Sequence, residues 1–190
     1  MQDLGFYFKL GWDHIIAWNA LDHLLFVLAL SAVYLIADWK KVLILVTAFT
    51  VGHSLTLILS ITDVVRLNDK LVEILIPCTI IITAGLNLWQ KAFDSKSLQR
   101  NYFLAFFFGL IHGLGFANYI RFMMSKDDSI GTDLLGFNLG LEAGQIVVVI
   151  AILLLSFMLV NTAGLKRKWW VWATSIFAIV LAAKMIWERV

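Results

Sequence analysis

The stretch LGFNLGLEAGQIVVVIAILLLSFMLV, residues 135–160, contains a single charged residue, Glu142. A helix needs about 20 consecutive, mostly apolar residues to cross the hydrocarbon core of a bilayer. This stretch is long enough and has no proline, so it is predicted to cross a membrane as a helix.

Five further segments have the same character, and the whole chain is correspondingly apolar. Hydrophobic residues make up 61% of the 190 residues and charged residues 15%, with a mean hydropathy of +0.87. So large an apolar excess cannot be hidden in one soluble core. The sequence predicts an all-α polytopic transmembrane helix bundle of about six spans, forming a single transmembrane domain over residues 1–190. The predicted spans are 18–37, 42–61, 72–91, 102–121, 135–160 and 169–187.

Tryptophans and basic residues mark the ends of these spans. Trp39, Trp89 and Trp187 lie near predicted boundaries, as expected for a ring that prefers the membrane–water interface. Basic residues cluster between spans on one side, at Lys40, Lys41, Lys91, Lys96, Arg100, Lys166, Arg167 and Lys168. The positive-inside rule makes that side cytoplasmic, so both termini are predicted to lie outside a bacterial-type inner membrane. The expected surroundings are lipid, and no arginine-rich patch with interleaved aromatics indicates nucleic acid.

Ionisable residues within the predicted spans fall at one level. At 1.5 Å per helical residue, His23, His53, His112 and Glu142 lie about 8, 12, 14 and 10 Å from the same face. Spans that run in opposite directions therefore bring their polar groups to a similar depth. His14 and Glu73 lie near the mouth of that outer half of the bundle.

This placement predicts a metal site. An ionisable residue at such depth costs about 3 kcal/mol unless it is paired or solvated. Neutral imidazoles and carboxylates are natural ligands for a divalent first-row metal. The predicted ligands are His14, Asp22, His23, His53, His112 and Glu142. The alternative is that these groups only hydrogen-bond neighbouring helices together.

Further polar residues flank the predicted ligands. Asn138, Glu142 and Gln145 share one face of their helix, and a glycine stripe on the opposite face is expected to pack against another helix. Thr50 and Ser54 are expected either to orient His53 or to bond back to their own helix carbonyls. The residues expected behind the ligands or along the pathway are Glu73, Thr50, Ser54, Asn138 and Gln145.

Four sequence blocks together resemble the HupE/UreJ family of membrane proteins. They are LDHLLF at 21–26, TAFTVGHSLTL at 47–57, FGLIHGLGFA at 108–117 and GFNLGLEAGQ at 136–145. The family's Asp-His motif matches Asp22 and His23, and its preceding histidine matches His14. That histidine is followed here by Ile15, where the hydrogenase-linked branch has proline, so the chain resembles the other branch.

The resemblance implies a nickel, or nickel and cobalt, permease, or an accessory protein that delivers metal to hydrogenase or urease. A divalent transition metal is thus the expected cargo, nickel by preference, with cobalt, zinc and copper as alternatives. A metalloenzyme maturation protein is the expected partner of the delivery role. Chemically, the same residues also suit an intramembrane zinc hydrolase, with Glu142 or Asp22 as general base.

Overall fold

The computed structural model describes residues 4–17, 20–89, 95–123 and 130–189, and this part of the chain is helical without any strand. The all-α fold class is therefore confirmed. The long helices are α1 (Leu4–Ile16), α2 (Leu21–Ser31), α3 (Trp39–Ile61), α4 (Asp69–Trp89), α5 (Ser95–Met123), α6 (Ile130–Ser156) and α7 (Arg167–Arg189). A short 3-10 helix, η1 (Ile36–Asp38), precedes α3, and a π-helical segment, η2 (Phe157–Thr162), follows α6.

Apolar helices long enough to cross a membrane account for most of the bundle. Within the described residues, 4 helical stretches meet that requirement, namely η1 with α3, α4, α6 with η2, and α7. The count rises to 5 if α1 and α2, bent by 69° relative to each other, form one broken span. Helix α5 is not among them, so the predicted count of about six spans is not confirmed.

The predicted first span, 18–37, differs most from the structure. Helix α2 covers only Leu21–Ser31, and residues 18 and 19 lie outside the described part of the chain, as do 90 and 91 at the end of the predicted span 72–91. Eleven residues of α-helix are about 16 Å long, which is half of a bilayer core. Hydropathy averaged along the sequence reports the length of an apolar segment but not where a helix bends or ends. The prediction therefore combined this half-length helix and the apolar residues after it in one span.

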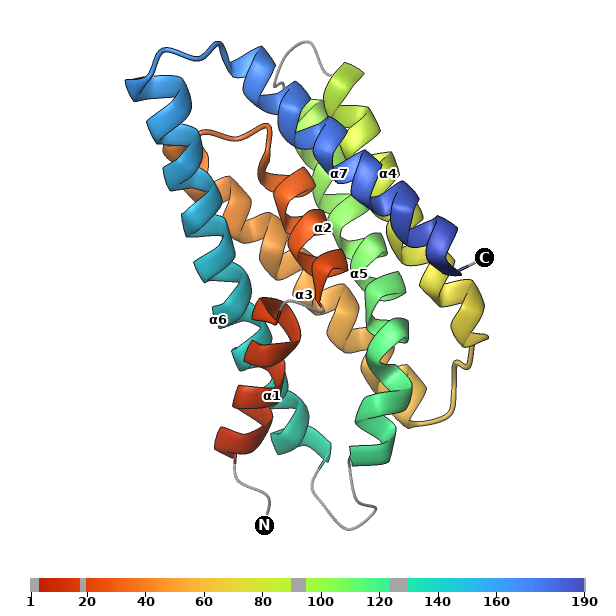
Figure 1. Ribbon diagram of the computed structural model, residues 1–190. Coiled ribbons are helices and arrows are strands. Elements are labelled where there is room, and N and C mark those ends of the chain that lie inside the picture. The colour runs from red at the N-terminus through yellow and green to blue at the C-terminus, as the bar shows by residue number, and fades with distance from the viewer. Residues whose placement is uncertain (1–3, 18–19, 90–94, 124–129, 190) are drawn as a thin grey trace.

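The helices alternate in direction through the bundle (Figure 1). Helices α1 and α2 follow one another from the N-terminal end upward, and α3, α5 and α7 run the opposite way. The first residues of α3 and α7 therefore lie toward the same end, together with the basic residues Lys40, Lys41 and Lys168. Lys91 lies outside the described residues.

Glycines bring two pairs of helices into backbone contact. A methyl group added to Gly11 or Gly140 would overlap backbone atoms across the α1–α6 contact. The same holds for Gly52, Gly109 and Gly113 across the α3–α5 contact. The predicted packing role of the glycine stripe on α6 is thus confirmed, and its partner is α1. These two close contacts hold the polar faces of four helices at fixed positions.

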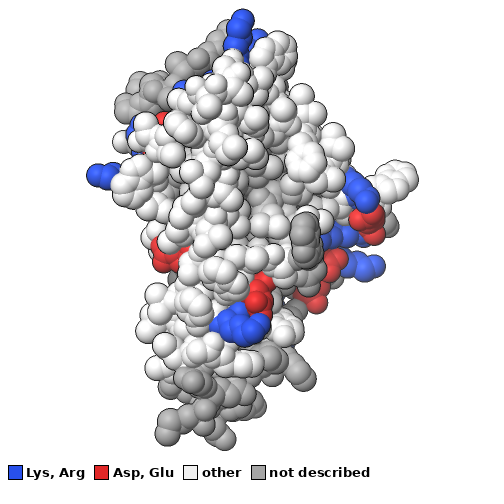
Figure 2. Space-filling view, turned by 60° about the vertical axis from the view of Figure 1, so that its left-hand side comes forward, with Lys and Arg blue, Asp and Glu red and all other residues white. Residues whose placement is uncertain are grey.

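The outer surface suits lipid. Large apolar side chains are exposed on every long helix, among them Ile44, Phe103, Ile150 and Val180. Figure 2 shows a broad stretch of the molecule without charged residues, between charges near its upper end and in its lower half. A soluble protein rarely exposes so much contiguous apolar surface. The chain is an integral membrane protein.

Candidate metal centre

The four histidines converge on one point inside the bundle. His14 comes from α1, His23 from α2, His53 from α3 and His112 from α5. The ring centroids of His14 and His23 are 4.5 Å apart, those of His23 and His112 5.1 Å, and those of His14 and His53 5.7 Å. His23, His53 and His112 are buried, and His14 is half-buried. Four helices thus each supply one imidazole to a single cluster.

Three of these histidines are close enough to share one ion. One nitrogen from each of His14, His23 and His53 lies within 4.8 Å of the other two. A zinc-like ion holds imidazole nitrogens at about 2.0–2.1 Å, so ligand nitrogens in a tetrahedral site are about 3.3 Å apart. Small side-chain rotations would close the remaining gap. His112 lies beside this trio and can supply a fourth nitrogen.

The break between α1 and α2 places two of the ligands. His14 is in the last turn of α1, and His23 is in the first turn of α2. The carboxyl end of a helix carries partial negative charge, which favours a cation beside His14. Non-helical backbone is tolerated at membrane depth only where protein or water covers it. Membrane transporters build substrate sites at such breaks, where helix ends meet.

The Asp22 carboxylate orients the His23 ring through a contact with Nδ1 of that ring. The Oδ1 atom of Asp22 lies 3.0 Å from Nδ1 of His23 and accepts the backbone N–H of the same residue at 2.8 Å. A carboxylate only accepts hydrogen bonds, so Nδ1 carries the proton and the lone pair of Nε2 is free. This carboxylate–histidine arrangement is the usual outer support of a metal-bound imidazole.

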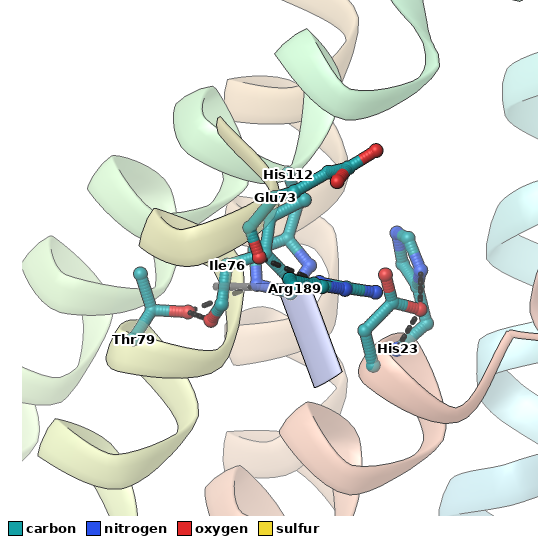
Figure 3. Close-up of polar contacts among 7 residues, drawn as sticks. His23, Glu73, Ile76, Thr79, His112 and Arg189 are labelled. Carbon is teal, nitrogen blue, oxygen red and sulfur yellow. Dashed lines mark hydrogen bonds and ion pairs between the residues drawn. The ribbon is translucent and has the colours of Figure 1, made fainter. Parts of the chain in front are cut away.

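Thr79 holds the His112 ring in the complementary way. The Thr79 hydroxyl donates to the carbonyl of Ile76 at 2.6 Å and lies 3.0 Å from Nε2 of His112 (Figure 3). Because its hydrogen is used on Ile76, the hydroxyl accepts from His112, so Nε2 is the protonated nitrogen. The lone pair of His112 is then on Nδ1.

The nitrogens left over by these contacts have no hydrogen-bond partner. They are Nε2 of His14, Nε2 of His23, both ring nitrogens of His53 and Nδ1 of His112. More than about 90% of buried polar groups in proteins are hydrogen-bonded, and each exception has a cost of about 1–3 kcal/mol. Several imidazole nitrogens without partners at one point form a cluster that could hold a divalent metal ion.

Aromatic rings close the cluster against water. Phe116 stacks near His14 with its centroid 3.9 Å away, and Phe26 and Phe49 lie 4.9 and 5.1 Å from His112. Phe137 lies 6.1 Å from His53. An apolar wall of this kind limits the access of water to the cluster and lowers the local dielectric.

Glu142 and Glu73 lie elsewhere in this conformation. The carboxylate of Glu142 accepts a hydrogen bond from Thr47 of α3 at 2.7 Å, and it does not belong to the group formed by His14, His23 and His53. Glu73 is exposed near the start of α4, where its backbone carbonyl accepts from Arg189 at 2.5 Å (Figure 3). The structure therefore brings all four histidines and Asp22 together but neither glutamate.

The other polar residues that were predicted to flank the ligands lie on α3 and α6. They are Thr50, Ser54, Asn138 and Gln145. The Thr50 hydroxyl lies 2.9 Å from Oε1 of Gln145 and 3.2 Å from the carbonyl of Val46, and Ser54 bonds back to the carbonyl of Thr50 at 2.7 Å. Ser54 thus follows the back-bonding alternative, whereas the shorter contact of Thr50 is with Gln145 of α6. Oδ1 of Asn138 and Nε2 of Gln145, both on α6, are buried without hydrogen-bond partners.

Thr79 contacts the histidine cluster but was not among the residues predicted from the sequence. Its signal was a polar residue every fourth position on an otherwise apolar helix, at Thr79, Thr83 and Asn87. Such spacing places all three on one helix face. Short hydroxyl side chains are common in membrane helices, so the spacing alone did not distinguish a site from helix packing.

Removing the Asp22 carboxylate should weaken metal binding without removing a ligand. For Asp22→Ala we expect an affinity lower by about 10–100-fold, because the His23 tautomer and ring orientation are no longer held. Equilibrium dialysis with Ni²⁺ measures the change. Asp13→Ala is the matched control, since Asp13 is exposed and pairs with Lys9. Equal affinity of Asp22→Ala and wild type would show that the pair has no such role.

A family model described as HupE / UreJ protein matches residues 1–189, which is nearly the whole chain. Comparison with curated proteins gave no match, and neither did comparison with solved structures. The matched range includes all four histidines and Asp22.

Proposed function

Because the chain belongs to the HupE/UreJ family, we propose that it is a membrane permease for a divalent transition-metal ion, nickel by preference. The observation that supports this most strongly is the set of orphaned imidazole nitrogens at the break between α1 and α2. A bound ion would give each of these nitrogens the partner that it lacks within the protein.

The ligand chemistry favours reversible binding. All four imidazoles are neutral ligands, and the described cluster has no thiolate and holds its one carboxylate against His23. Imidazole suits nickel, zinc and copper, and cobalt follows the same trend. A mostly neutral donor set does not cancel the charge of the ion, so the ion is held less tightly than in a closed thiolate site. Such a site favours cargo over a permanent cofactor.

His14 is the proposed point of access. It is the half-buried member of the cluster, and it lies on α1, whose first residues are near the N-terminal end of the bundle (Figure 1). We place this end outside the cytoplasmic membrane, with both termini outside, on the basis of the basic residues at the opposite end. A metalloenzyme maturation protein on the inner side is the proposed recipient.

Glu142, Glu73, Asn138 and Gln145 are proposed as pathway groups. Glu142 is held by Thr47 at the α3–α6 contact, one helical turn from the Thr50–Gln145 pair. A rotation of α6 relative to α3 would exchange Thr47 for the ion as the partner of Glu142. In that conformation Glu142 would be a ligand, as its position in the sequence predicts.

Uptake by proteoliposomes tests the proposal. Purified protein is reconstituted, Ni²⁺ is added outside, and internal metal is followed with a trapped fluorescent chelator. Wild type should give saturable uptake, and His53→Leu should reduce the initial rate to the level of empty liposomes. Asp13→Ala is the control for handling and reconstitution.

The same assay separates the alternatives. Tight stoichiometric Ni²⁺ binding without flux would replace transport by a metal-delivery role. Zinc that stays bound through dialysis and does not exchange would favour the hydrolase. If the protein neither binds nor transports Ni²⁺, that result would contradict metal handling altogether.

A further inference from the structure

A line of buried polar groups leads from the histidine cluster along α4 to the opposite half of the bundle. Thr79, Thr83 and Asn87 follow one another at every fourth residue and are all buried. Thr79 contacts His112, and the Thr83 hydroxyl donates to the carbonyl of Thr79 at 2.8 Å. At 1.5 Å per residue, the line extends about 12 Å from the level of the site toward the end of α4.

The line ends at a small cavity. Thr83 and Asn87 line this cavity together with Asn101 of α5, and its volume is about 10 Å³. That is close to the least volume that holds a water molecule, about 10–15 Å³. Leu30 and Phe108 close its remaining sides. Beyond it, Asn101 donates to the hydroxyl of Tyr34 at 3.1 Å, so polar contacts continue toward the inner end.

The carboxyl end of α2 reaches the same place. The amide of Asn87 donates to the carbonyl of Ala29, in the last turns of α2, at 2.6 Å. The carboxyl end of a helix carries partial negative charge, which attracts a cation. Helix α2 thus has Asp22 and His23 at its start and a cation-favouring end beside the cavity.

We propose that the α4 line Thr79–Thr83–Asn87, with Asn101, is the release path by which the metal ion leaves the histidine cluster toward the inner side. This inference rests on the proposed transport function. Hydroxyl and amide oxygens are weaker ligands than imidazole for nickel-like ions, so each step along the line binds the ion less strongly than the cluster does. A metal ion can leave the histidine cluster toward the inner side only if the sites that follow do not hold it more strongly.

Thr83→Val tests the path, because it removes the hydroxyl and keeps the branched shape of the side chain. We expect the initial rate of Ni²⁺ uptake into proteoliposomes to fall about tenfold, the equivalent of one lost polar contact of about 1.4 kcal/mol. Equilibrium affinity for Ni²⁺ should stay within about twofold of wild type, since the histidines are untouched. Thr83→Ser keeps the hydroxyl and should restore the rate.

Thr174→Val on α7 is the matched control. Thr174 is buried to a similar degree and its hydroxyl also bonds back to its own helix, at the carbonyl of Trp170, but it lies off the path. Asn101→Leu is a second path variant, and it should also slow uptake with affinity unchanged. It keeps the test decisive if Thr83→Val does not fold.

The possible failures are distinguishable. Wild-type uptake with unchanged rates in both Thr83→Val and Asn101→Leu would overturn the release path and leave the transport function standing. Absence of uptake by wild type would overturn the transport function itself. A parallel loss of affinity and rate would assign these residues to the binding site instead of the path.

Discussion

Replacing His53 with leucine should abolish metal binding and should not destabilise the metal-free protein. His53 is completely buried, and neither of its ring nitrogens has a hydrogen-bond partner. We expect Ni²⁺ affinity to fall by about 100-fold or more, which corresponds to about 2.8 kcal/mol. Leucine removes an unsatisfied buried polar group whose cost is about 1–3 kcal/mol, so the apo protein should melt at the same or a higher temperature.

Thermal melting in detergent, with and without Ni²⁺, measures both effects in one experiment. Wild type should gain stability from the ion by mass action, and His53→Leu should not. If His53 served only to bind helices together, leucine would lower the melting temperature of the apo protein. That result, with metal affinity unchanged, would contradict a metal site at this position.

Adding one methyl group at Gly113 should disrupt the site through the backbone. A Cβ atom there would lie 2.5 Å from the carbonyl oxygen of His53, so α3 and α5 would have to separate at the level of the cluster. We expect Gly113→Ala to cost about 1–3 kcal/mol of stability, as overpacking does. Metal affinity should fall with it, because His53 and His112 move apart.

Gly85→Ala is the control for this variant. A Cβ atom at Gly85 meets nothing within 4 Å, and alanine favours a helix over glycine by about 1 kcal/mol. Its melting temperature and Ni²⁺ affinity should equal or exceed those of wild type. Normal affinity in Gly113→Ala would show that the close α3–α5 contact is not needed to assemble the site.

The long apolar helices could be predicted from the sequence because lipid imposes a simple requirement of length and composition. The regions of α3, α4, α6 and α7 follow directly from it. The break between α1 and α2 could not be predicted, because no proline or glycine marks it. Where the chain bends depends on tertiary contacts, in particular the glycine contact that ties α1 to α6.

The common level of His23, His53 and His112 could be predicted from their depth in the spans, whereas the place of Glu142 could not. Depth fixes a level in the bundle, but the rotation of a helix about its axis decides which neighbour a side chain meets. On α6 the glycine face is taken by α1, and Glu142, on the opposite face, meets Thr47 of α3. Hydrophobic patterning contains little of this rotational information, because α6 is apolar nearly all round.

Equilibrium dialysis of the purified protein against Ni²⁺, with elemental analysis, tests the metal centre most directly. Wild type should take up about one Ni²⁺ per chain reversibly, and a variant with both His53→Ala and His112→Ala should take up none while remaining folded. If neither protein binds Ni²⁺, Co²⁺, Zn²⁺ or Cu²⁺ and both are folded, the histidine cluster is not a metal site.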